Sequence, residues 1–257
     1  MKEGQRLWTR DELILAMNLY CKLPFGRLHS RNPEIIHLAE LIDRTPSSVA
    51  LKLVNFASLD PSITGSGRKG AVNTSKLDKE IWYEFYNNWD TLPYESEKLL
   101  AAYEQKTIES LFQLEEPTVF MEGKTREQVL RMRVNQWFFR KSILASYNST
   151  CCITGLKQPE LLIAGHIIPW SLDEKNRLNP RNGILVNALH DKAFETGLIT
   201  IDPTLHVRVA KALFKQKSDP AIFQYFLRYD GQPILQPTRF LPDDQFIQYH
   251  NEKVFLG

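Results

Sequence analysis

Cysteine is scarce in this 257-residue chain, and the way it is distributed excludes several kinds of site. There are three cysteines, Cys21, Cys151 and Cys152, an odd number that includes two neighbours in sequence. Neighbouring cysteines rarely form a disulfide with each other, so reduced thiols and a cytoplasmic location are expected. No two cysteines have the CxxC spacing, which argues against a structural zinc ribbon.

An excess of charge and long apolar runs are also missing. The formal net charge is +2, so any basic surface for nucleic acid must come from local clusters of Lys and Arg. No apolar run approaches the length of a membrane span, and the first residues lack a signal-peptide pattern. These features predict a soluble protein with no membrane partner. The chain is long enough for one large domain or two modest ones.

The first 60 residues contain the start signals of three helices. The second and third helices are separated only by a short turn, which is the spacing of a helix-turn-helix. The segment also resembles the Myb or SANT type of three-helix DNA-binding domain, and we predict a DNA-recognition domain over residues 1–60. The start signals are a capping box, Thr9 with Glu12, and two N-caps followed by proline, Asn32–Pro33 and Thr45–Pro46.

On the third helix, a polar stripe could read DNA bases. Ser48, Lys52 and Asn55 share one face, and an asparagine amide can pair with adenine. Arg68 and Lys69, in the glycine-rich loop that follows, could reach backbone phosphates. The alternative is that this helix packs against the next domain, because alanine and valine form a second apolar stripe on it.

Residues 61–122 are expected to form a loop and a helical connecting region. A long helix then begins at a capping box formed by Thr125 and Gln128. Arg126, Arg133 and Arg140 repeat every seven residues along one face of this helix. The stripe is either a solvated surface or a set of phosphate contacts.

The segments "LIAGHIIPW" and "NPRNGILVNALHDKAFETGLITID" carry the residues best suited to chemistry. His166 ends an apolar strand, Asn182 precedes a second short strand, and His190 lies at the start of a helix. A single histidine in an apolar strand is usually a hydrogen-bonded core residue. Three such residues at the junctions of two strands and a helix indicate a functional site instead.

The order of these residues, preceded by "CCITG", resembles the HNH nucleases, and the likeness extends over about residues 126–257. The resemblance implies a ββα-metal nuclease domain over residues 123–257, within an α+β chain that is helical in its N-terminal half. It also implies that His166 is the general base, that Asn182 orients it, and that His190 binds Mg²⁺ or Mn²⁺. The flanking residues resemble the subgroup found in bacterial restriction-type endonucleases.

One residue departs from the family pattern. Many HNH enzymes have Asp, Glu or His just before the base, as a second metal ligand, and this chain has Gly165. Glu160 lies six residues before His166, too far along an extended strand to replace that ligand. Asp191 and Glu195 lack the four-residue spacing from His190 that would place them on its face of the helix. Water and substrate phosphate are then expected to complete the shell of a magnesium ion.

The sequence therefore predicts a metal-dependent endonuclease that acts on double-stranded DNA, in restriction or host defence. A homodimer is expected, because a double-strand cut is most easily made by two copies of a single-site module. Two alternatives remain at this stage. One is a DNA-binding protein with an inactive module, suggested by Gly165, and the other is a nicking or structure-specific nuclease of repair or mobile elements.

Overall fold

The computed structural model describes residues 6–65, 74–112 and 125–257. Two compact units make up the chain, Met1–Lys141 and Ser142–Gly257, and each has its own core. The expected segments 1–60 and 61–122 share the first unit, and the division falls inside a helix rather than at residue 122. Helices together with two small sheets agree with the predicted α+β class. None of the helices in the described ranges is long and apolar enough to cross a membrane.

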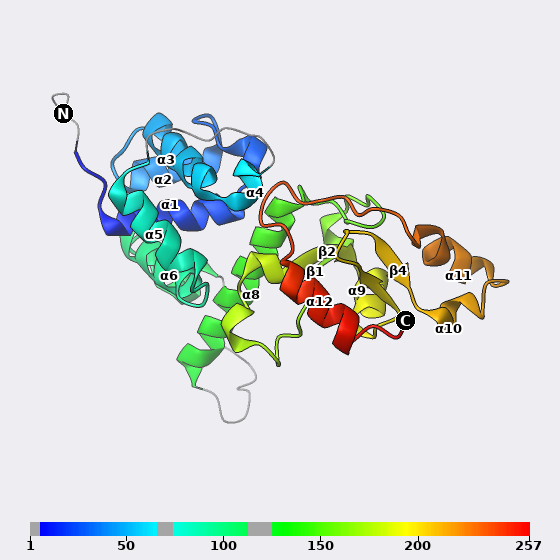
Figure 1. Ribbon diagram of the computed structural model, residues 1–257. Coiled ribbons are helices and arrows are strands. Elements are labelled where there is room, and N and C mark those ends of the chain that lie inside the picture. Colours follow the sequence, from blue (N-terminus) through cyan, green and yellow to red (C-terminus); the bar gives the residue numbers. More distant parts are fainter. Residues whose placement is uncertain (1–5, 66–73, 113–124) are drawn as a thin grey trace. The chain divides into compact units, whose positions relative to one another are not determined.

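The first unit is built around one central helix, α1 (Figure 1). Almost all of α1 from Glu12 to Cys21 is buried, because α3, α5 and α6 pack around it, with α2 against α3. Its helices are α1 (Arg10–Lys22), α2 (Pro33–Leu41), α3 (Pro46–Leu59), α4 (Pro61–Thr64), α5 (Lys76–Tyr86), α6 (Leu92–Tyr103) and α7 (Ile108–Leu111), with η1 (Phe25–Arg27) and most of α8 (Arg126–Ser146).

The helix starts that the sequence predicts are confirmed. Thr9 and Glu12 form the reciprocal capping box of α1. Asn32 and Thr45 accept hydrogen bonds from the first turns of α2 and α3, each with proline in that turn. Local signals of this kind act within four residues, so they can be recognised without knowing the tertiary structure.

In the second unit, a β-hairpin is followed directly by a helix. β1 (Leu162–His166) pairs antiparallel with β2 (Gly183–Asn187), and His166 lies opposite Gly183. Asn187 caps α9 (Ala188–Glu195), which packs on both strands (Figure 1). The middle of β2 is fully buried, and this explains why its sequence is a continuous apolar run.

The remaining elements of this unit surround the hairpin and α9. β3 pairs antiparallel with β4, and α12 packs on β3. The elements are η2 (Pro159–Leu161), η3 (Glu174–Asn176), η4 (Pro180–Asn182), β3 (Ile199–Ile201), β4 (Val207–Val209), α10 (Lys211–Phe214), α11 (Pro220–Tyr225), η5 (Leu227–Tyr229) and α12 (Asp244–Lys253).

Candidate active site

His166 lies at the end of β1 with its ring fixed in one orientation. Its Nε2 is 2.8 Å from the backbone carbonyl oxygen of Arg177. A carbonyl oxygen only accepts, so Nε2 carries the hydrogen and Nδ1 is the basic nitrogen. The ring of Trp170 packs edge-on against it, with centroids 5.4 Å apart. Burial lowers the pKa of His166, and the bond to Arg177 only partly opposes this, so the imidazole is neutral near pH 7.

Asn182 is fully buried beside this histidine's loop and joins two segments of backbone. Its Oδ1 accepts from the N–H of Ile168 at 2.8 Å, and its Nδ2 donates to the carbonyls of Ile168 and Asn176, each at 3.2 Å. Asn182 thus connects the residues after β1 to the loop before β2. That loop includes Arg177, whose carbonyl holds the His166 ring.

A carboxylate from α9 occupies the space that a side chain at Gly165 would need. A Cβ added to Gly165 would lie 2.5 Å from Oδ1 of Asp191, far inside van der Waals contact. Glycine at this position therefore allows the Asp191 carboxylate to lie directly against β1. Gly165, where a second metal ligand was expected and is absent, makes room for a carboxylate from another element.

Asp191 and Glu195 line the same cavity as His166, with a volume of about 250 Å³. The two carboxylates are four residues apart on α9, so they lie on one face of the helix. Burial raises the pKa of Asp191, and the charge of Glu195 raises it further. A signal for this pair was present in the sequence. The spacing of either residue from His190 does not reveal the pair, whereas the four-residue spacing between Asp191 and Glu195 does.

His190, the predicted metal ligand, is not among the residues that line the cavity of His166. Its Nδ1 accepts from Nδ2 of Asn187 at 2.9 Å, and its Nε2 donates to the carbonyl of Tyr225 at 2.7 Å. It is buried and lines a different cavity, with Asn187, Tyr225 and residues before β1. Successive helical residues point about 100° apart, so the turn that brings Asp191 onto β1 directs His190 elsewhere.

On that other side, the His190 ring is paired with a thiol. Cys151 is fully buried, and its Sγ accepts from the N–H of Thr154 at 3.4 Å. Burial raises the pKa of Cys151, but the neighbouring His190 ring and hydrogen bonds from Thr154 outweigh it and bring the pKa to about 7. The role of His190 in this structure is therefore to hold the segment before β1 against α9 and α11.

The residues around His166 can be tested for their fit to a metal ion. In residues 6–65, 74–112 and 125–257 there is no group of three or more His, Cys, Asp or Glu side chains with metal-site geometry. Asp191 supplies a hard carboxylate oxygen of the kind that Mg²⁺ and Mn²⁺ prefer. Magnesium commonly keeps several waters and takes one or two protein carboxylates plus substrate phosphate. One or two carboxylates beside a neutral histidine fit that pattern.

The polar stripe expected on the third helix is not available as an exposed surface. The Lys52 ammonium forms an ion pair with Asp78 on α5, at 2.7 and 2.9 Å from its two oxygens. The buried Asn55 amide donates to the same carboxylate at 3.2 Å. Asp78 is fully buried, so both side chains join α3 to α5. These contacts disfavour the prediction that Lys52 and Asn55 read bases; Ser48 and Lys52 are partly exposed, and Asn55 is buried.

The other predicted DNA contacts fall in two groups. Arg68 and Lys69 lie outside the described residues. Arg133 is exposed on α8, and Arg140 is half-buried one heptad later. Arg126 is exposed as well and lies 3.8 Å from a carboxylate oxygen of Glu109, so Arg140 is the least exposed of the three.

Comparison with known families gives a match over the segment that contains the site described above. A family model described as HNH endonuclease matches residues 151–202, the segment that contains β1, β2, α9 and β3. No curated protein matches the chain in sequence. The match supports assignment of this segment to the HNH family and indicates a nuclease-type activity.

Proposed function

We propose, from the HNH match of residues 151–202, that the protein is a metal-dependent endonuclease that hydrolyses DNA phosphodiesters. The observation that carries this proposal is the Asp191 carboxylate, which lies against Gly165 in the same cavity as His166. An inactive module was suggested by the absence of a ligand at Gly165. A carboxylate from α9 removes that reason, and the β1–β2–α9 arrangement is that expected of a ββα-metal nuclease.

In the proposed reaction, Nδ1 of His166 takes a proton from the attacking water. The neutral state of the ring at pH 7 and the fixed hydrogen on Nε2 both favour this direction of transfer. Asn182 keeps the loop, and through it the Arg177 carbonyl, in place. It acts as a positioning residue, because its amide is used up by backbone groups and does not face the cavity.

Asp191 would hold the metal ion, with Glu195 as the neighbouring carboxylate on the same helix face. A divalent cation bound there would neutralise charge on the phosphate and stabilise the leaving oxygen. Mg²⁺ or Mn²⁺ is the ion expected from these oxygen ligands. Arg133 and Arg140 remain proposed phosphate contacts, while the base-reading surface has to be sought away from Lys52 and Asn55.

The biological role that we propose is restriction or host defence, carried out on double-stranded DNA. Incubating supercoiled plasmid with the protein and Mg²⁺, Mn²⁺ or EDTA tests this function. Linear product supports a double-strand endonuclease, and with it the proposed homodimer. Nicked circles support a nicking or repair nuclease, and retained binding with no metal-dependent product supports an inactive module.

His166→Ala is expected to lower plasmid cleavage by at least a hundredfold, because a general base contributes about 10²–10⁴ to the rate. DNA affinity measured without metal should stay within about twofold, since the base acts only in the chemical step. Turnover by this variant at the wild-type rate would show that His166 is not the base.

A further inference from the structure

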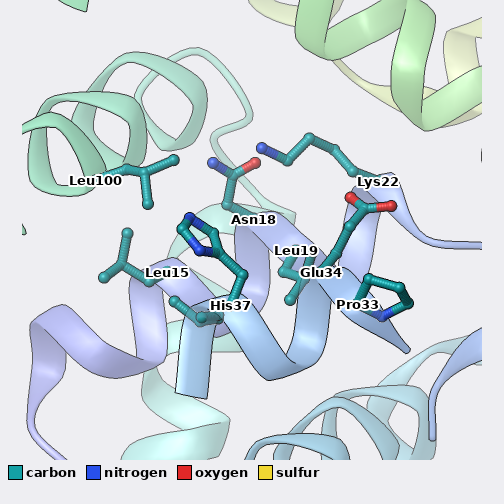
Figure 2. Close-up of a pocket in the computed structure, with 9 residues that line it drawn as sticks. Leu15, Asn18, Leu19, Lys22, Pro33, Glu34, His37 and Leu100 are labelled. Carbon is teal, nitrogen blue, oxygen red and sulfur yellow. The ribbon is translucent and has the colours of Figure 1, made fainter. Parts of the chain in front are cut away.

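The two units contain cavities of different character. The cavity among α1, α2 and α6 is walled largely by leucines, among them Leu15 and Leu100, and has a volume of about 330 Å³ (Figure 2). The lysine that lines it, Lys22, forms an ion pair with the buried Glu97. The cavity beside β1 instead has His166 and two carboxylates in its wall. Residues that tune a reaction are therefore to be found around the cavity beside β1.

Arg177 holds both ends of a segment in the loop that follows β1. Its backbone carbonyl accepts from His166 Nε2, and its side-chain Nε donates to the backbone carbonyl of Trp170 at 2.7 Å. The guanidinium lies over the Trp170 ring, 5.3 Å from its centroid, and Nη2 donates to Glu174 Oε1 at 3.0 Å. One residue thus fixes the histidine ring with its main chain and the path of residues 170–177 with its side chain.

Trp170 completes a closed set of contacts around His166. The contacts run from the His166 ring to the Arg177 carbonyl, and from the Arg177 guanidinium to Trp170. They return to His166 because the Trp170 ring packs edge-on against it and lines the same cavity. A guanidinium suits this position, since it can contact an aromatic ring and donate hydrogen bonds from its edge at the same time.

The surroundings of Arg177 favour a role through His166 over a contact with DNA. Arg177 is not among the residues that line the cavity, although His166 and Trp170 are. Its Nε and Nη2 already have protein acceptors. The Glu174 carboxylate is largely exposed, so that ion pair contributes little. The bond to the Trp170 carbonyl and the contact with its ring are therefore the main restraints on the side chain.

We propose that Arg177 is a positioning residue for the general base, and that it acts through its bond to the Trp170 carbonyl rather than through its charge. Small displacements of a reacting group cost large factors in rate, so the orientation of the His166 ring matters. Asn182 donates to the carbonyl of Asn176, so the two side chains hold neighbouring peptide groups of one loop. The kinetic part of this inference rests on the proposed function, whereas the hold on the ring can be measured without DNA.

Arg177→Gln and Arg177→Met separate the hydrogen bond from the charge. Glutamine places an amide N–H at the same distance along the side chain as the arginine Nε–H, so it can keep the bond to the Trp170 carbonyl. Methionine has a similar length and no donor. Arg181→Met is the matched control, because Arg181 lies in the same loop, is similarly exposed and pairs with Asp243 at 2.8 Å.

The first measurement is hydrogen exchange at the His166 ring, followed by NMR of the full-length protein with isotope-labelled histidine and without DNA or metal. The Nε2–H is hydrogen-bonded in the wild type and should exchange slowly, and His166→Ala identifies its signal. We expect exchange to become about tenfold faster in Arg177→Met, which corresponds to the loss of about one hydrogen bond. In Arg177→Gln and Arg181→Met it should stay within about twofold of the wild type.

The second measurement is the rate of plasmid cleavage. In Arg177→Met we expect kcat to fall about tenfold with KM within about twofold, because the base is misplaced while DNA contacts remain. Arg177→Gln and Arg181→Met should cleave at nearly the wild-type rate. If the wild type cuts no DNA, the proposed function fails, and the exchange rates still decide whether Arg177 holds the ring.

Three results would overturn the positioning role. One is slow ring exchange together with wild-type kcat in Arg177→Met. Another is an equal effect of Arg177→Gln and Arg177→Met on exchange or on KM, since that identifies the charge, as in a phosphate contact, as the active feature. The third is loss of the fold in Arg177→Met, seen by circular dichroism, because the residue would then stabilise the unit as a whole.

Discussion

At the scale of single residues, Gly165 and Asp191 form a pair in which one provides the space for the other. Gly165→Ala would place a methyl group 2.5 Å from the present position of Asp191 Oδ1, so the carboxylate has to move. We expect plasmid cleavage to fall at least tenfold, and the Mg²⁺ concentration for half-maximal rate to rise, because the proposed metal ligand is displaced. A metal titration of the cleavage rate measures both effects.

Gly26→Ala is the matched control, because a Cβ at Gly26 meets no atom within 4 Å. It should leave cleavage unchanged. Wild-type cleavage and metal affinity in Gly165→Ala would show that Asp191 does not act from its position against β1.

His250 is a buried histidine whose ionisation should make stability depend on pH. Its Nε2 donates to the Phe194 carbonyl at 3.1 Å, its Nδ1 accepts from Thr200 Oγ1 at 2.8 Å, and its ring stacks on Phe194. Burial lowers the pKa of His250 from 6.5 to about 4, although the Phe194 bond opposes this. The unfolded chain therefore takes up a proton before the folded one, and stability is lost as pH falls from 6.5 towards 4.

The expected loss from this group is about 3 kcal/mol over that range, or about 1.4 kcal/mol per pH unit. Urea unfolding of the wild type and of His250→Gln, at several pH values, measures it. The variant cannot titrate there, so its stability should fall less steeply with acid. Parallel curves for the two proteins would exclude His250 as the source.

The site residues show which information a sequence contains at this scale. The positions of His166 at the end of β1 and of Asn182 just before β2 could be predicted from the order strand, loop, strand. His190 and Asp191 line different cavities, since neighbouring positions on a short helix point in different directions and the sequence does not show which one faces β1. Asp191 was missed because its approach depends on the absent side chain of Gly165, a contact between two different elements.

At the scale of helices and strands, the residues at which helices begin could be predicted from the sequence. The element that packs against each helix face could not. The capping residues of α1, α2 and α3 act locally, and all three were correct. The polar face of α3 also has the predicted composition. Asp78, 26 positions after Lys52 in the sequence, contacts this polar face of α3. Helical periodicity does not reveal that contact.

Removal of the Lys52 charge should weaken the packing of α3 against α5. Lys52→Met leaves Asp78 buried without its cationic partner, and we expect the free energy of unfolding to drop by about 3 kcal/mol. Lys76→Met is the control, because the exposed Lys76–Glu80 pair should contribute less than about 0.5 kcal/mol. Denaturant unfolding of both variants gives the comparison. Equal small losses would mean that the buried pair does not join the helices.

At the scale of the whole molecule, the chain divides into two units with separate cores. The sequence predicted a domain boundary after residue 122, and the observed division lies at residue 141, inside α8. A continuous helical pattern gives no signal of where one core stops and the next begins. Composition could bound the number of domains, but the boundary depends on long-range packing.

The distribution of the three thiols across these units makes them natural reporters of local opening. Cys21 is buried in the first unit, and Cys151 and Cys152 are buried in the second. A thiol reagent reaches a buried cysteine only when the surrounding structure opens. The labelling rate of each cysteine therefore measures how often its unit opens locally. We expect Cys21 and the Cys151–Cys152 pair to label at different rates in mild denaturant, as followed by mass spectrometry. A single common rate would mean that both cores open in one cooperative step.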